Sequence, residues 1–332
     1  MIDCISIKKK TIAPPLYLAP MAGVTHSAFR RLMADFGGYG ALTTEMVSAR
    51  ALLNENIHRS PYTKRRDCEG VVIYQLLLNG EENLKSVVDK CLDHIQAEIL
   101  DINLGCPAPS IRKMKGGFEL FDDYDRLEKM IEVVRDAWPK PLTVKCRLGR
   151  DHPGWRDAFV KRIALFEKVG IDSITVHPRF SKEKLKRNAR WSEFPWINSL
   201  TSLPIIANGD IKSKDDLKNN ADFFADVSGI MIGRMAVIQP WVFRDWEQKT
   251  NAIDYKMIWF RYFDYVREDF LPAQALGRIK EFTGYFSRNF TFGHRWTAQM
   301  QNAETLTMCE NLTRSFFDLE PPVNSSPSIR SI

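Results

Sequence analysis

The stretch EILDINLGCP, residues 98–107, decides the fold of this 332-residue chain. Its apolar residues Ile99, Leu100 and Ile102 are typical of a buried strand, and the glycine and proline that follow end the strand abruptly. Asn103 and Cys106 therefore stand at the carboxyl end of a strand, where parallel α/β proteins place their chemistry. A lone cysteine is more often a buried structural residue, so this stretch by itself leaves the role of Cys106 open.

Eight such strands recur along the chain, separated by segments of helical periodicity. Apolar residues spaced i, i+3, i+4 and i+7 predict helices over Asn83–Gln96, Tyr124–Trp138 and Asp157–Val169. Eight βα units over about 240 residues predict a (β/α)8 TIM barrel. A doubly wound sheet is the alternative, but no GxGxxG follows the first strand. The expected strands are Leu16–Met21, Ala41–Met46, Val71–Leu77, Ile99–Gly105, Leu142–Leu148, Ser173–Arg179, Pro204–Asp210 and Gly229–Arg234.

The alternation of strands and helices stops after Trp241. From Ile253 the chain predicts helix after helix, rich in aromatic residues and without strand-like runs. We therefore expect a barrel domain over residues 1–245, a small all-α domain over residues 246–320, and a loose, Pro- and Ser-rich tail over residues 321–332.

The composition is that of an ordinary soluble globular protein, with 44% hydrophobic and 27% charged residues. No apolar run approaches the length of a membrane span, and the amino-terminal residues lack the apolar core of a secretory signal. The six cysteines show no CxxC or CxxH spacing, so we expect neither a disulfide framework nor a metal site. These features predict a cytoplasmic protein, and since nothing suggests an obligate interface, we expect a monomer.

The net charge of +6 belongs to the barrel, because nine Lys and Arg balance nine Asp and Glu from residue 250 onward. Basic residues cluster at 64–66, 112–115 and 182–190. Each cluster alone is best explained as a solvated surface run. Together with the site residues described next, they favour a polyanionic partner.

Polar residues follow nearly every expected strand, and in a barrel these positions meet at one face. Lys145 and Arg147 lie two apart on one strand and point the same way, and buried lysine is rare without an anionic partner. Gly209 and Gly233, after the seventh and eighth strands, allow a close backbone approach to an anion, and Arg234 adds a bidentate donor. Two tight turns with an incidental arginine are the alternative. Together the strand ends predict a phosphorylated cofactor or substrate.

The strand-end sequences resemble, in order, the motifs of the tRNA-dihydrouridine synthase family. The resemblance covers the whole barrel, and the following helical domain is similar too. The GCP sequence with Gly116 and Gly117 downstream, and the VKxRLG pattern, are specific, whereas APM and NGD occur in other flavin barrels. The resembling segments are APMAGVT (19–25), TTEM (43–46), YQLLLNG (74–80), DINLGCP (101–107), VKCRLG (144–149), VHPR (176–179), IANGDI (206–211) and MIGRMA (231–236).

The resemblance implies an enzyme in which FMN, reduced by NADPH, saturates the C5–C6 double bond of particular uridines in tRNA. The C-terminal pattern is most similar to the bacterial subgroup that acts on uridine 16. Carried over residue by residue, Pro20, Met21 and Ala22 line the flavin ring, and Gln75 and Lys145 hydrogen-bond its polar edge. The residues expected at the ribityl phosphate are His177, Asn208, Gly209, Asp210, Gly233 and Arg234.

Cys106, by the same resemblance, is the general acid that protonates uracil C5 after a hydride passes from flavin N5 to C6, and Asn103 positions the base. A thiol suits this role because it is protonated near neutral pH and still able to give up a proton. A thiolate nucleophile is the alternative, but it needs a neighbouring base or cation, and the sequence shows no dedicated partner. Lys145 beside N1 would stabilise an anionic reduced flavin.

The target uridine lies inside folded tRNA, so it must turn outward into the pocket. The loop at residues 108–121 is more basic and less glycine-rich than in the family, and Pro178 stands where the family has glycine. Two alternatives therefore stay open: a flavin barrel that reduces a small molecule, and an RNA-binding homologue without turnover. The residues expected to contact tRNA are Lys115, Arg147, Arg179, Arg278 and Lys280.

Overall fold

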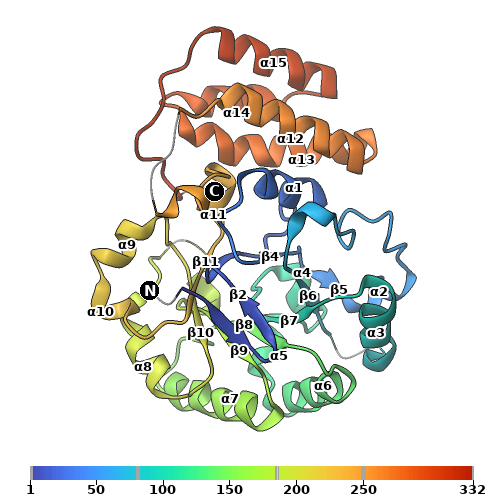
Figure 1. Ribbon diagram of the computed structural model, residues 1–332, viewed down its shortest axis with the longest axis vertical. Coiled ribbons are helices and arrows are strands. Elements are labelled where there is room, and N and C mark those ends of the chain that lie inside the picture. The colour runs from blue at the N-terminus through green and yellow to red at the C-terminus, as the bar shows by residue number, and fades with distance from the viewer. Residues whose placement is uncertain (1–2, 80–82, 184, 186, 248–251, 331–332) are drawn as a thin grey trace.

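Eight parallel strands form a barrel with helices around it (Figure 1). The computed structural model describes residues 3–79, 83–183, 185, 187–247 and 252–330, so Lys184 and Lys186 of the predicted basic run lie outside the described residues. The predicted TIM barrel and its eight strands are confirmed. The strands are β3 (Leu16–Leu18), β4 (Leu42–Thr43), β6 (Val72–Leu77), β7 (Ile99–Leu104), β8 (Leu142–Arg147), β9 (Ser173–His177), β10 (Ile205–Asn208) and β11 (Gly229–Ile232).

The strands pair side by side in the order β3-β11-β10-β9-β8-β7-β6-β4, and a short strand β5 (Val47–Ser48) pairs with β6. The backbone N–H of Leu18 donates to the carbonyl of Ala41 at 3.0 Å, which brings β3 beside β4 and closes the ring. Several strands end two or three residues earlier than predicted. The predicted ends include residues that in the structure belong to the loops of the mouth, such as Pro20, Arg179 and Asp210.

The amino-terminal end of the barrel is closed by a hairpin that the sequence did not predict. It consists of β1 (Ile5–Ile7) and β2 (Lys10–Ile12), paired antiparallel. Ile7 and Ile12 are buried in a cluster that includes Ile99 from the barrel interior. Access to the barrel interior is therefore left to the carboxyl ends of the strands, the usual site of chemistry in this fold.

The helices outside the barrel follow the predicted periodicity. In α6, a cap from Asp123 starts the helix and Leu127, Ile131 and Val134 are buried against the barrel, each contributing about 1.5–3 kcal/mol. The three predicted helices correspond to α3, α6 and α7 and are confirmed. The outer helices are α1 (Ser27–Phe36), α2 (Ala49–Asn54), α3 (Leu84–Lys90), α4 (Pro109–Lys113), α5 (Phe118–Asp122), α6 (Tyr124–Ala137), α7 (Trp155–Val169), α8 (Phe194–Ser199), α9 (Lys214–Lys218), α10 (Ala221–Phe224) and α11 (Arg234–Ile238).

Four helices form the region above the barrel in Figure 1: α12 (Tyr255–Asp269), α13 (Pro272–Phe286), α14 (Gly293–Gln301) and α15 (Leu306–Asp318). Their core is aromatic, with stacked pairs such as Trp296 on Phe316 at 4.4 Å between ring centroids. The region packs on α1 and α11 of the barrel.

None of the described helices is long and apolar enough to cross a membrane. The domain boundary at residue 245 stays a prediction.

Part of the predicted basic run at 64–66 ties the helical region to the barrel. The carboxylate of Asp269, at the end of α12, accepts hydrogen bonds from Lys64 at 2.7 Å, Arg66 at 2.6 Å and Ser27 at 2.7 Å. Burial alone would raise the pKa of Asp269, but the hydrogen bonds from Lys64 and Ser27 and the charge of Arg66 lower it. These basic residues therefore have a structural role.

Residues 321–330, which we name the return segment, make hydrogen bonds with distant parts of the chain, whereas the sequence predicts a loose tail over residues 321–332. The segment leaves α15 and runs back to the barrel near α11 (Figure 1). The backbone of Asn324 donates to Asn289 at 2.6 Å, and Thr291 donates to Pro322 at 3.0 Å. A polar, Pro- and Ser-rich composition does not predict such contacts with residues far away in the sequence.

Candidate active site

A cavity of about 260 Å³ opens at the carboxyl ends of the barrel strands. Most of the predicted site residues line it; Gln75, Lys115, Arg179, Arg278 and Lys280 do not. The lining residues are Ala19, Pro20, Met21, Ala22, Met46, Asn103, Gly105, Cys106, Pro107, Lys145, Arg147, His177, Leu185, Asn208, Gly209, Asp210, Ile211, Met231, Gly233, Arg234, Met235, Tyr285 and Ile329.

Gln75 and Asn103 belong to a buried hydrogen-bond network beneath the cavity. The side-chain amide of Asn103 donates to Gln75 Oε1 at 2.7 Å, and Gln75 Nε2 donates to Asp101 at 2.7 Å. Thr143 donates to the other oxygen of Asp101 at 2.6 Å. Burial raises the pKa of Asp101 to about 6. Gln75 is fully buried, so its contact in this structure is with Asn103 and not with the cavity.

The oxygen of the Asn103 side chain shapes the loop that carries Cys106. It accepts hydrogen bonds from the backbone N–H of Cys106 at 3.0 Å and of Gly105 at 3.3 Å. On the other side, Gly117 has φ +54°, and a Cβ there would lie 2.9 Å from the carbonyl oxygen of Cys106. A glycine is therefore required at 117 for the chain to pass this close to the cysteine. The free, partly exposed thiol of Cys106 lines the cavity from this fixed loop.

Lys145 and Arg147 alternate along β8 and both line the cavity, as predicted. Burial, together with the charge of Arg147, lowers the pKa of Lys145 to about 8. Among the described residues, no hydrogen-bond acceptor contacts the Lys145 ammonium, and Asp101 is near enough only to favour its charge. An ammonium of this kind, half-buried beside a cavity, fits the polar edge of an anionic ligand.

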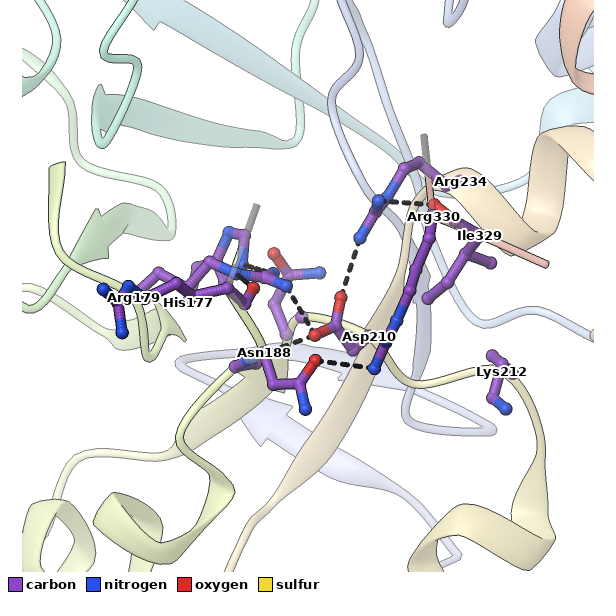
Figure 2. Close-up of polar contacts among 12 residues, drawn as sticks. His177, Arg179, Asn188, Asp210, Lys212, Arg234, Ile329 and Arg330 are labelled. Atoms are coloured by element: carbon purple, nitrogen blue, oxygen red, sulfur yellow. Dashed lines mark hydrogen bonds and ion pairs between the residues drawn. The ribbon is translucent and has the colours of Figure 1, made fainter. Parts of the chain in front are cut away.

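Cations dominate the end of the cavity formed by β9, β10 and β11 (Figure 2). The Asp210 carboxylate accepts from Arg179 at 2.5 Å, from Arg234 at 2.7 Å and from the backbone N–H of Ala189 at 2.8 Å. Arg179 also donates to Nε2 of His177 at 2.7 Å. Through these hydrogen bonds Asp210 orients the two arginines. It is not itself a phosphate ligand, because a carboxylate would repel a phosphate.

His177 is neutral in this setting. Burial and the charges of Arg147 and Lys145 hold its pKa well below the ordinary value. A neutral ring can accept through Nε2 from Arg179 and carry its proton on Nδ1. The loop beside it depends on Gly209, whose φ is +110° and where a Cβ would lie 2.6 Å from the His177 ring. Only glycine therefore fits at 209, and the predicted approach of its backbone to an anion stays a prediction.

The backbone contributes donors to the same end. The N–H groups of Gly209 and Gly233 make no hydrogen bond within the described part of the chain. They lie near the guanidinium of Arg234, the first residue of α11. Amide donors and an arginine around a small space are the elements of a phosphate site in barrel proteins. The residues present therefore fit a phosphorylated cofactor.

The part of the cavity wall formed by the loop after β3, which neighbours β11, is apolar. Pro20, Met21 and Ala22 line it from the loop after β3, and Thr25 fixes this loop by accepting from the Met21 N–H at 3.0 Å. The backbone of Gly23 donates to the buried Glu45 at 2.7 Å. This arrangement of an apolar wall, a lysine and a cationic end matches the division of a flavin nucleotide into ring, polar edge and phosphate.

The residues predicted to contact tRNA lie in different environments. Arg179 is 2% exposed and its donors are used within the protein, whereas Lys115 is exposed on the loop after Cys106. Arg278 donates to the Tyr62 hydroxyl at 2.8 Å at the junction of the barrel and the helical region. Lys280 donates to the Gln301 carbonyl at 2.9 Å, away from the mouth. Residues two positions apart on a helix point to nearly opposite sides, which explains why Arg278 and Lys280 have different partners.

Two lining residues from outside the barrel were not predicted. Tyr285 comes from α13, and burial raises its pKa to about 12. Its spacing of seven from Arg278 places both on one helix face, a signal that could have identified it. Ile329 comes from the return segment, and no local pattern in that polar stretch indicates burial.

Fold and site together define a TIM-barrel enzyme with a thiol, a lysine and a cationic end at its mouth. The family model "Dihydrouridine synthase (Dus)" matches residues 17–314. The chain therefore belongs to the dihydrouridine synthase family.

Curated relatives match about seven tenths of the chain. The chain is 34% identical over 245 residues to a probable tRNA-dihydrouridine synthase of Rickettsia conorii, covering 72% of this chain and 71% of the relative. It is 30% identical over 246 residues to tRNA-dihydrouridine synthase B of Pseudomonas putida, covering 74% and 72%. Among solved structures, an old yellow enzyme homologue from Zymomonas mobilis matches with a TM-score of 0.53 and 12% identity, over 79% of this chain and 98% of that one. This last likeness concerns the fold alone.

Proposed function

We propose that this protein is an FMN-dependent tRNA-dihydrouridine synthase that uses NADPH to reduce particular uridines of tRNA. The observation that carries the proposal is the placement of Cys106 on a fixed loop, in one cavity with Lys145 and the cationic end at Arg234. Membership of the dihydrouridine synthase family supports it. The choice of uridine 16 stays a prediction.

FMN would occupy the cavity with its ring against Pro20, Met21 and Ala22 and its phosphate near Arg234. Lys145 would donate to the polar edge of the ring, where its charge favours an anionic form. When bound and reduced, FMN supplies the hydride that adds to C6 of the uracil. His177 and Arg179 hold the cationic end in place through their contacts with each other and with Asp210.

Cys106 would give the second hydrogen atom, as a proton from Sγ to C5 of the base. Asn103 is a positioning residue for this step, because its carbonyl oxygen fixes the loop of Cys106 through two backbone N–H groups. The structure thus supports a role for Asn103 in holding the acid, in addition to the predicted contact with the base. Gln75, beneath it, would fix the orientation of the Asn103 amide.

The substrate would enter from the open carboxyl end of the barrel as a base turned out of the RNA. Lys115 and Arg112, exposed on the loop after Cys106, are free of the domain junction and would contact phosphates. Arg112 is partly neutralised by Glu119 at 2.8 Å, so Lys115 is the better candidate for a phosphate contact. Such contacts position the RNA and carry little sequence information.

The test is an anaerobic single-turnover experiment. The purified protein is reduced with NADPH, tRNA lacking dihydrouridine is added, and flavin absorbance is followed. Rapid re-oxidation by this tRNA, but not by fully modified tRNA, supports the proposal. A flavin that is reduced but ignores RNA indicates a small-molecule oxidoreductase, and a protein without flavin indicates an RNA-binding homologue. Cys106→Ala should bind FMN as the wild type does and form no dihydrouridine; retained activity would contradict the acid role.

A further inference from the structure

The return segment crosses the cationic end of the candidate active site. Ile329 is 8% exposed and lines the same cavity as Cys106 and Lys145. Its carbonyl oxygen accepts a hydrogen bond from Nη1 of Arg234 at 2.6 Å. Figure 2 shows Arg234 between this carbonyl and the carboxylate of Asp210. A segment far along the chain thus contacts the residue expected to hold the cofactor phosphate.

The segment is anchored on both sides of this contact. Val323 pairs with Phe290 in an isolated antiparallel bridge. Nη1 of Arg288 donates to the carbonyls of Ser328 at 3.0 Å and Arg330 at 2.5 Å. The Arg330 guanidinium donates to Asn188 of the loop after β9 at 2.9 Å. The polypeptide therefore spans from the helical region across α11 to the far side of the mouth.

The contact determines where the Arg234 guanidinium points. Nη2 donates to Asp210 and Nη1 donates to Ile329, so acceptors on two sides fix its plane. A guanidinium has five N–H donors, and these two bonds leave others for a ligand. Burial lowers the pKa of Arg234 from its ordinary value, although Asp210 favours the charged form. Without the Ile329 carbonyl, one of the two fixed acceptors would be lost.

The segment also borders both the active-site cavity and a second, outer cavity of about 990 Å³. Ile329, Asp210 and Arg234 line both spaces, while Lys212, Arg187 and Ser326 line the outer one. Removing the segment would join the cationic end of the site to this larger, open space. Water could then reach the phosphate contacts, which are stronger when water is excluded.

We propose that Ser328, Ile329 and Arg330 form the outer wall of the cofactor phosphate site and position Arg234 for the phosphate. The inference rests on the proposed function, because it takes FMN as the ligand. It concerns the phosphate alone, because the isoalloxazine ring would lie against the loop after β3. Ile329 is thus a positioning residue that acts through its backbone carbonyl and its buried side chain.

The test compares FMN with riboflavin, which has the same ring and no phosphate. Apoprotein of the full chain, and of a variant that ends at Ser325, is titrated with each flavin while flavin fluorescence is measured. The variant keeps the pairing of Val323 and the backbone bond of Asn324. We expect its Kd for FMN to rise at least tenfold and its Kd for riboflavin to change less than threefold. Ile329→Asp, which adds a negative charge beside the phosphate, should give the same selective loss, and Ile329→Val should not.

The outcomes separate the inference from the proposed function. Equal affinity of the shortened and full-length proteins for FMN would overturn the inference, and so would an equal loss for both flavins, which would indicate general structural support. Full-length protein that binds neither flavin would instead refute the proposed function, and the inference with it. A selective loss for FMN, reproduced by Ile329→Asp, supports both.

Discussion

Gly209→Ala is the sharpest test of how the cationic end is built. The residue has φ +110°, a conformation that L side chains rarely adopt, and its Cβ would lie 2.6 Å from Cδ2 and 2.9 Å from Nε2 of His177. His177 cannot move away without breaking its 2.7 Å contact with Arg179. The backbone strain costs roughly 1–3 kcal/mol and the overpacking roughly 1–3 kcal/mol. The expected loss of folding free energy is therefore about 2–6 kcal/mol.

The assay is urea denaturation of the apoprotein together with FMN titration. If part of the strain is relieved by displacing His177, the Kd for FMN should rise at least tenfold, which corresponds to about 1.4 kcal/mol. Gly277→Ala is the matched control, because a Cβ at this helical position meets nothing within 4 Å. It should raise stability by up to about 1 kcal/mol and leave FMN binding unchanged. Unchanged stability and a Kd within threefold of wild type for Gly209→Ala would refute the reasoning.

Three further predictions address the lysine, the cysteine loop and the domain junction. Because the pKa of Lys145 is about 8, its charge is present below pH 8 and lost above, so the affinity of the wild type for reduced FMN should fall above pH 8. Lys145→Met should bind reduced FMN roughly tenfold more weakly and should not show this fall. The measurement is a titration at pH values from 6.5 to 9.5. Asn103→Ala removes the oxygen that fixes the Cys106 loop, so kcat should fall roughly 10- to 100-fold while FMN binding is unchanged. An unaltered single-turnover rate would contradict this positioning role of Asn103. Since the pKa of Asp269 is lowered on folding, its ion pair with Lys64 stabilises the protein fully above the ordinary carboxyl range, and this stabilisation is lost as the pH falls through the lowered pKa of the folded protein. In urea denaturation, Asp269→Asn should therefore cost about 3 kcal/mol at pH 7 and progressively less below about pH 4; a cost that does not fall with pH would refute this.

The barrel and most of its mouth were predictable because the determining signals are local. Each parallel strand is a short apolar run, and the residue types that end it fix which side chains reach the mouth. The amino-terminal hairpin was missed because its strands have only three residues each and the exposed Lys8 and Lys9 lie between them. The return segment was missed because its contacts are with residues such as Arg234 and Arg288, far away in the sequence.

The role of Gln75 and Asp210 could not be read from position alone. Both stand at strand ends that face the mouth, but in the structure Gln75 bonds to Asn103 and Asp101, and Asp210 bonds to Arg179 and Arg234. Their side chains therefore support the residues that face the cavity. Whether a strand-end side chain reaches a ligand or its neighbour depends on side-chain packing, which a pattern of residue types does not specify.

A pattern of residue types also does not specify which cations are paired within the protein. The structure indicates that Lys145 is the most informative cation of the site. Lys64 belongs to one of the basic runs that together favoured a polyanionic partner, yet its ammonium binds Asp269 at the domain junction. Arg179 was predicted to contact tRNA and is buried among acceptors of its own chain. Each of these cations has acceptors built into the fold. Lys145 lies beside the cavity with no acceptor in the described part of the chain, and its pKa is lowered by burial. Because an unpaired buried charge costs free energy in the unliganded protein, a bound anion recovers more at Lys145 than at any cation that is already paired.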